Sequence, residues 1–81
     1  MDKATINFQE FVTRWNMEII PNKAKDIRLG QSLMNYLHEI WREEYVRISS
    51  VHYYDQTNID CFYVDDLIPN TLKHLEKVWK N

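Results

Sequence analysis

The chain has 81 residues, which is enough for one hydrophobic core and too few for two. Its residues are 44% hydrophobic and 27% charged, which excludes a disordered chain. A formal net charge of −2 gives no overall field that attracts nucleic acid or anionic membranes, and a single cysteine excludes an internal disulfide framework. Since the sequence shows neither a membrane-span pattern nor a secretory pattern, we expect a cytoplasmic protein.

The first predicted helix covers residues 7–20. Asn7 is its predicted N-cap, because the side-chain oxygen can accept a hydrogen bond from an unpaired amide, and Glu10 completes a capping box three residues later. Pro21 disfavours the helical conformation of the residue before it, so we expect the helix to end at Ile20. Apolar residues fall three and four positions apart along this segment, forming one stripe: Phe8, Phe11, Val12, Trp15 and Ile19.

A second helix is predicted to begin near Asp26 and to follow a long apolar stripe. The stripe contains Gly30, the only glycine of the chain, although a glycine inside a helix costs about 1 kcal/mol relative to alanine. We interpret Gly30 as a close-contact position for a large side chain, with Trp15 and Trp79 as candidates; the alternative is a loose first turn. After Glu43 the helix either continues or restarts beyond a bend. The stripe consists of Ile27, Gly30, Leu33, Met34, Leu37, Ile40, Trp41, Tyr45 and Ile48.

Residues 49–66 form the least regular part of the sequence. We predict a loop followed by a short helical turn over residues 61–64, with Asp60 as its cap. A last helix is predicted to follow its N-cap Asp66, which places Pro69 in the first turn, where no amide is needed. Its apolar stripe consists of Ile68, Leu72, Leu75 and Trp79.

These elements predict an all-α fold. We expect a compact single domain over residues 1–81, with three main helices plus a short helical turn. The three large indole rings are expected to lie in or near one core, and they belong to Trp15, Trp41 and Trp79.

Three segments of the chain resemble a group of small, uncharacterised bacteriophage and prophage-type proteins. "RLGQSLMNYL" is similar to the pattern R-x-G-Q-x-x-x-N-x-L, "DCFYVDDLIP" to D-x-F-Y-x-D-x-x-I-P, and "LEKVW" to a terminal helix ending in Trp. The stretch "RISSVHYYDQTNI" is longer than the connection in that group. The resemblance implies a phage-like origin and a compact fold, and it brings no known activity. It covers residues 8–79 and includes Arg28, Gly30, Gln31, Asn35, Leu37, Asp60, Phe62, Tyr63, Asp65 and Trp79.

Catalytic and metal-binding interpretations of the cysteine and the histidines find little support in the sequence. Acidic neighbours such as Asp65 would raise the pKa of Cys61, so we interpret Cys61 as a small buried hydrophobic residue and not as a nucleophile. His38, His52 and His74 share no ligand spacing with one another or with the cysteine. We therefore expect no enzymatic activity, no catalytic residue, no cofactor and no metal.

The most distinctive surface feature predicted from the sequence is a mixture of tyrosines and acids. We expect Tyr53, Tyr54 and Asp55, with Asp65 at the edge, to bind a protein partner. Aromatic rings supply contact area in interfaces, and carboxylates steer a basic partner. The alternative interpretation is that the rings of this region close the core while its acids cap helices.

These residues predict a non-enzymatic protein-binding module whose partner is a host protein with a basic surface. Together with the resemblance, they suggest a phage-encoded inhibitor of a host defence complex, similar in role to anti-CRISPR proteins, or of another host complex. The alternative is a small nucleic-acid-binding accessory protein. That function would use the basic row Lys73, Lys77 and Lys80.

Overall fold

The computed structural model describes residues 6–49 and 59–79, and these ranges contain helices and turns with no strand. The all-α prediction is confirmed. The predicted number of helices is corrected, because the second apolar stripe divides into two helices and raises the main helices from three to four. The elements are α1 (Phe8–Arg14), η2 (Trp15–Ile19), α2 (Ile20–Asn22), α3 (Leu29–Ile40), α4 (Arg42–Ser49), η4 (Asp65–Leu67) and α5 (Ile68–Val78).

The first helix begins as predicted and ends two residues later than predicted. The Asn7 side chain accepts a hydrogen bond from the Glu10 amide at 2.8 Å. The helix continues through Ile20 and Pro21 because η2 is a π-helical segment with wider turns, in which the Ile20 amide donates to the Trp15 carbonyl. In a regular α-helix the proline ring would clash with the carbonyl four residues earlier, and the wider π turn gives the ring room.

The helix predicted on the second apolar stripe begins later than predicted, and the stripe is divided between two helices. Asp26 lies in a turn before the helix and is not its cap; α3 begins at Leu29, after an extended Arg28. At Trp41 the backbone leaves the helical region (φ −146°, ψ 75°), and α4 restarts with a hydrogen bond from the Tyr45 amide to the Trp41 carbonyl. Of the two alternatives for this region, the restart after a bend is confirmed.

Residues 61–64 form a hydrogen-bonded turn and not the predicted helical turn. The Val64 amide donates to the Cys61 carbonyl at 3.3 Å, and the Asp60 side chain accepts a hydrogen bond from the Phe62 amide at 3.0 Å. Asp60 therefore stabilises a turn and does not cap a helix. The short helical element lies further along the chain, in the 3-10 helix η4.

The last helix, α5, confirms the predicted position of its proline and corrects its cap. The N-cap is Leu67, one residue after the predicted Asp66, because η4 occupies the residues before the helix. Pro69 lies in the first turn of α5, where its missing amide removes no hydrogen bond.

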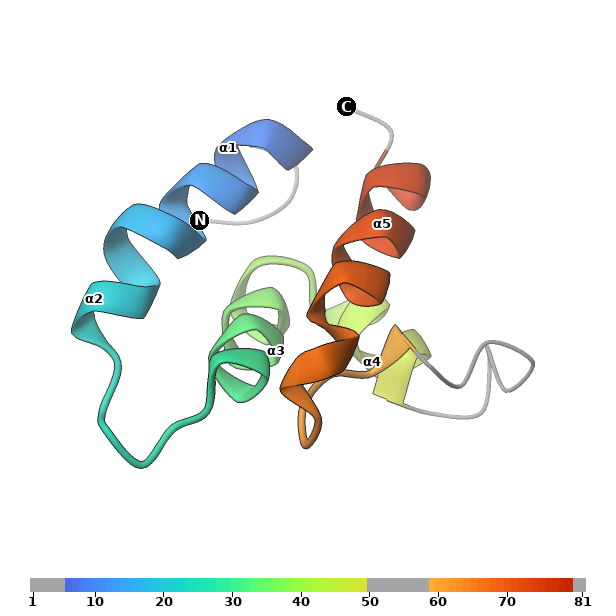
Figure 1. Cartoon of the computed structure of the whole chain (residues 1–81). Helices are drawn as coiled ribbons and strands as arrows, with labels where there is room; N and C mark the ends of the chain where they lie inside the picture. Colours follow the sequence, from blue (N-terminus) through green and yellow to red (C-terminus); the bar gives the residue numbers. More distant parts are fainter. Residues whose placement is uncertain (1–5, 50–58, 80–81) are drawn as a thin grey trace.

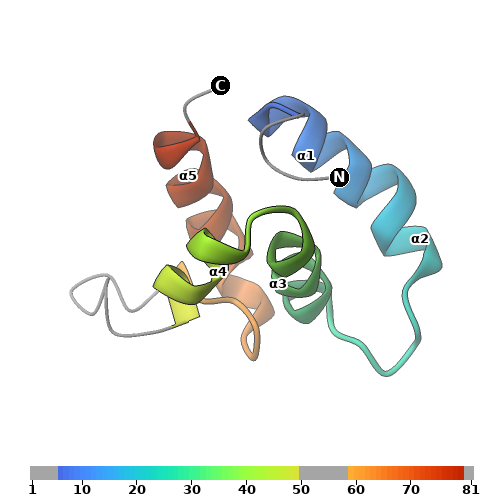
Figure 2. The ribbon, with the colours of Figure 1, turned by 180° about the vertical axis from the view of Figure 1, so that it is seen from behind.

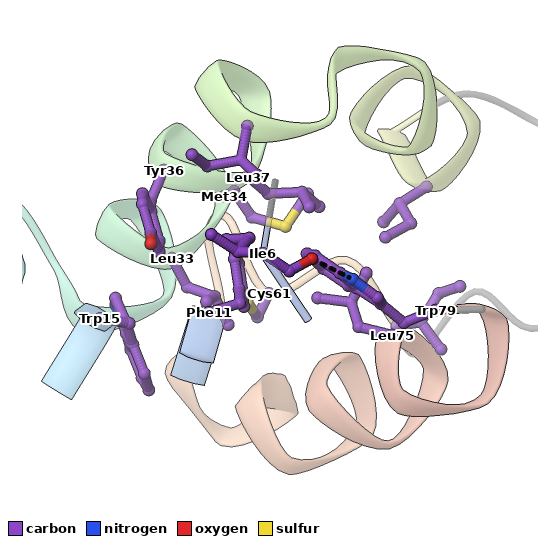
Figure 3. Close-up of a cluster of buried hydrophobic side chains, with 13 residues drawn as sticks. Ile6, Phe11, Trp15, Leu33, Met34, Tyr36, Leu37, Cys61, Leu75 and Trp79 are labelled. Atoms are coloured by element: carbon purple, nitrogen blue, oxygen red, sulfur yellow. Dashed lines mark hydrogen bonds between the residues drawn. The ribbon is translucent and has the colours of Figure 1, made fainter. Parts of the chain in front are cut away.

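The core lies where α3 is enclosed by the first helical run and α5. Figures 1 and 2 show α3 between these two elements from opposite sides. Side chains from all three meet in Figure 3, where the Trp79 indole donates to the Ile6 carbonyl at 3.3 Å. Trp15 and Trp79 are buried, and Trp41 packs against Trp79 with ring centroids 5.3 Å apart, so the predicted place of the tryptophans is confirmed. The buried hydrophobic cluster consists of Ile6, Phe11, Trp15, Leu33, Met34, Tyr36, Leu37, Ile40, Ile48, Ile59, Cys61, Leu75 and Trp79.

Among the described residues, no helix is both long and apolar enough to cross a membrane.

Candidate functional site

The predicted partner-binding residues fall on two parts of the chain. Tyr53, Tyr54 and Asp55 lie outside the described residues, so their prediction remains a prediction. Asp65 is described, and it lies in a turn packed against the start of α3. We call residues 60–64 together with Asp65, the first residue of η4, the 60–65 turn; it is the described part of the predicted surface.

Gly30 is the position at which this turn meets α3. A Cβ atom added at Gly30 would overlap the carbonyl oxygen of Cys61 and would stand 3.1 Å from the Asp65 carboxylate. The close contact predicted for the only glycine is therefore present. Its partner is the backbone of the turn and not Trp15 or Trp79, as the sequence had suggested.

Asp65 caps α3 from a distance of 35 residues along the chain. Its Oδ1 atom accepts a hydrogen bond from the Gly30 amide at 2.9 Å, and the residue in the N-cap position, Arg28, makes no side-chain capping bond. A carboxylate at this end of a helix satisfies an unpaired amide and complements the helix dipole. The carboxylate predicted to face a partner is thus already engaged within the fold.

Arg28 holds the outer part of the same turn. Its guanidinium donates to the Phe62 carbonyl at 3.0 Å and lies over the Tyr63 ring, 5.6 Å from the ring centroid. The Tyr63 ring also meets Phe62 edge-on, at a centroid distance of 4.7 Å. The backbone under Tyr63 is therefore fixed by several contacts.

The turn and the start of α3 present three large hydrophobic side chains to solvent. Tyr63 is 77% exposed, Val64 is 47% exposed, and Leu29 at the start of α3 is 38% exposed. We call Arg28, Leu29, Tyr63 and Val64 the Tyr63 patch. A hollow of about 220 Å³ is lined by Tyr45, Ser49, Asp60, Phe62 and Tyr63.

Cys61 lies under the patch and is fully buried. Its thiol donates to the Gly30 carbonyl at 3.5 Å, and burial raises the pKa of the thiol, with the charges of Asp60 and Asp65 acting in the same direction. At neutral pH the sulfur is therefore protonated and out of contact with solvent. A reactive cysteine needs a lowered pKa and an exposed sulfur, and this environment provides neither.

The described histidines do not form a ligand set. His74 Nε2 donates to the Glu44 carboxylate at 2.7 Å in the interior, and Arg47 pairs with the other oxygen of Glu44 at 3.0 Å. His38 stacks edge-on against Tyr45. Within residues 6–49 and 59–79, no three His, Cys, Asp or Glu side chains are grouped in a way that could hold a metal ion.

Comparison of the chain with protein-family models, with curated proteins and with solved structures gives no significant match. The arguments about function below therefore rest on the residues and contacts of this chain.

Sequence reasoning missed the main features of the patch, Tyr63 and Arg28. The sequence groups Tyr63 with the other aromatic residues of its region, and it gives Arg28 no role beyond its place in the resemblance. Arg28 and Gly30 bond to Phe62 and Asp65 of the turn, which lie 34 and 35 residues away in the chain. No spacing within one segment of the sequence indicates such a contact.

Proposed function

We propose that the protein is a non-enzymatic protein-binding module that uses the Tyr63 patch. The observation that supports this most directly is the exposure of Tyr63 on a turn whose backbone is held by Gly30, Asp65 and Arg28. A rigid, exposed aromatic ring loses little conformational entropy on binding, and tyrosine is enriched among the residues that dominate interface energies.

The charge around the patch favours a basic partner. Asp60, Asp65 and Asp66 lie within or beside the turn, and Arg28 is the cation of the patch, with its guanidinium engaged by the Phe62 carbonyl. Residues 53–55, which lead toward this turn in the sequence, add the predicted contacts of Tyr53, Tyr54 and Asp55. The resemblance to phage and prophage proteins makes a host protein the natural partner, such as a component of a defence or transcription complex.

The test compares Tyr63→Ala with Met17→Ala in capture of partners from a host lysate. Met17 is also an exposed large side chain, 72% exposed, and it lies on η2 away from the patch. We expect one captured protein to be retained by the wild type and by Met17→Ala and lost by Tyr63→Ala. With the purified partner, Tyr63→Ala should weaken binding by about thirtyfold, or roughly 2 kcal/mol.

Two outcomes would contradict the proposal. Equal binding by both variants would place the contact elsewhere, and the double variant Tyr53→Ala/Tyr54→Ala would then test the other predicted residues. Capture of nucleic acid, with an affinity that falls steeply with salt, would favour the alternative accessory protein that uses Lys73, Lys77 and Lys80. Circular dichroism and melting of each variant serve as the control for folding.

A further inference from the structure

A groove between η2 and α3 lies apart from the Tyr63 patch and contains an unpaired polar atom. The hydroxyl of Tyr36 is buried and has no hydrogen-bond partner among the described residues. Tyr36 itself is only 7% exposed, and its ring stacks on Phe11 with centroids 4.6 Å apart and planes 8° apart. A buried hydroxyl without a partner costs about 1–3 kcal/mol, so its presence requires an explanation.

Tyr36 forms part of the wall of two adjoining hollows along the groove. Their volumes are about 290 Å³ and about 230 Å³, and both are lined by Glu18, Ile19, Tyr36 and Glu39. Figure 3 shows the Tyr36 ring extending from α3 with its oxygen on the side of Trp15, the first residue of η2. The volume is suited to a small organic molecule.

The charge of the groove is set by two carboxylates on facing elements. Glu18 comes from η2 and Glu39 from α3, both are exposed, and neither forms an ion pair within the described part of the chain. Arg14 lines the smaller hollow and is paired with Glu10 at 2.9 Å. In the larger hollow the two acids outnumber Lys23, the one Lys or Arg of its lining.

Part of the wall of each hollow is apolar. Ile19 and Ile27 line the larger hollow beside the Tyr36 ring, and Ile40 lines the smaller one. Burial raises the pKa of the Tyr36 hydroxyl, so the group stays neutral and its oxygen remains able to accept a hydrogen bond. The π-helical turns of η2 are a rare element that often occurs at binding sites, and here they supply one wall.

We propose that this groove binds a small organic cation that has a primary ammonium head and a short apolar stem. The ammonium group donates three hydrogen bonds, and the groove offers three acceptors: the carboxylates of Glu18 and Glu39 and the hydroxyl oxygen of Tyr36. The stem lies against Ile19, Ile27 and the tyrosine ring. The site is independent of the proposed protein-binding function, because it shares no residue with the Tyr63 patch.

The test is an NMR titration of the full chain with n-butylammonium chloride, with n-butanol and sodium butyrate as controls at equal ionic strength. We expect a dissociation constant on the order of 1 mM for the ammonium probe and much weaker binding of the alcohol and the carboxylate. Binding of n-butanol as tight as that of the ammonium would overturn the proposal, because the carboxylates would then have no role.

Variants of the three acceptors sharpen this test. Tyr36→Phe should weaken binding of the ammonium by about tenfold, and Glu18→Gln and Glu39→Gln by about threefold each. Glu76→Gln, an exposed acid on α5, and Tyr63→Ala should leave it unchanged. Tyr36→Phe should melt at the same or a higher temperature, since it removes an unpaired buried group. Unchanged ammonium binding or a lower melting temperature in Tyr36→Phe would overturn the assignment of the hydroxyl.

A further probe, Nα-acetyl-lysine methylamide, distinguishes a site for a free amine from a site for a lysine side chain of a polypeptide. If it binds less than tenfold tighter than n-butylammonium, the groove is a site for a free amine, as proposed. If it binds at least tenfold tighter, the groove recognises a lysine side chain of a polypeptide, and the free-amine assignment is wrong.

Discussion

At the scale of single residues, Gly30 shows how one missing side chain can determine a tertiary contact. The space that a Cβ would fill contains the carbonyl oxygen of Cys61. The helix-propensity cost of glycine, about 1 kcal/mol, is offset because α3 and the 60–65 turn can approach each other closely.

Gly30→Ala should therefore destabilise the protein, although alanine is the better helix former. The added methyl group meets a backbone atom, which cannot move aside like the end of a flexible side chain, so we expect a loss of about 1–3 kcal/mol in the free energy of unfolding. Urea denaturation measures it. Asn35→Ala, an exposed substitution on the same helix, should change stability by less than about 0.5 kcal/mol. A Gly30→Ala protein as stable as the wild type would contradict this account.

At the scale of secondary-structure elements, helix starts differ in where their caps come from. α1 is capped by Asn7, whose side chain accepts a hydrogen bond from the amide three residues later in the chain. α3 is capped by Asp65, whose side chain accepts a hydrogen bond from an amide 35 residues earlier. The 60–65 turn and the beginning of α3 are therefore expected to form or to separate together.

Substitution of Asp65 tests the long-range cap. Asp65→Ala removes the acceptor of the Gly30 amide and should cost about 1 kcal/mol in the free energy of unfolding. Asp65→Asn keeps an oxygen acceptor of the same size and should retain most of the stability, with a small loss from the missing charge. Thermal and urea melts of both variants give the comparison. Equal losses for alanine and asparagine would show that the charge, and not the hydrogen bond, stabilises this contact.

The difference between these caps also explains which elements the sequence predicts. The start of α1 and the position of Pro69 in α5 follow from residues adjacent in the chain, and both predictions are confirmed. The sequence predicts the start of this helix near Asp26, because the acceptor in the structure, Asp65, is too distant in sequence to be recognised. The extension through Pro21 was missed because periodicity does not distinguish a π-helical segment from the end of a helix.

The candidate site was predictable only in part, for the same physical reason. The sequence identified an acidic and aromatic segment and included Asp65 in it. It could not separate Tyr63, which is exposed, from Phe62, which packs against the core, because their neighbours along the chain are nearly the same. Burial of adjacent residues in a turn is decided by the contacts of Arg28 and Gly30, which are remote in sequence.

At the scale of the whole molecule, α4 and α5 are joined through a buried polar contact as well as through apolar packing. Glu44 is 1% exposed, and its two oxygens accept hydrogen bonds from His74 on α5 and Arg47 on α4. A carboxylate at such depth is stable only while both oxygens are hydrogen-bonded. This contact orients α4 relative to α5.

Glu44→Gln should lower the free energy of unfolding by about 2 kcal/mol, because it removes the charge that both partners face. Glu43→Gln, an exposed neighbour on the same helix, should change it by less than about 0.5 kcal/mol. Urea denaturation with detection of tryptophan fluorescence measures both. If the two variants were equally stable, the buried carboxylate would contribute nothing to the packing of α4 on α5.

The position of Cys61 gives this protein a built-in reporter of its own motion. The chain has one thiol, which the 60–65 turn carries and buries against the Gly30 carbonyl and Thr71 of α5. A labelling reagent reaches the sulfur only during moments in which the turn lifts from α3 or the whole chain unfolds. The labelling rate, divided by that of the unfolded chain at the same pH, thus gives the fraction of time spent open, with a tenfold slower rate for each 1.4 kcal/mol of opening free energy. A partner that binds Tyr63 and holds the turn closed would therefore slow the labelling of the Cys61 thiol. The measurement places no label on the binding surface.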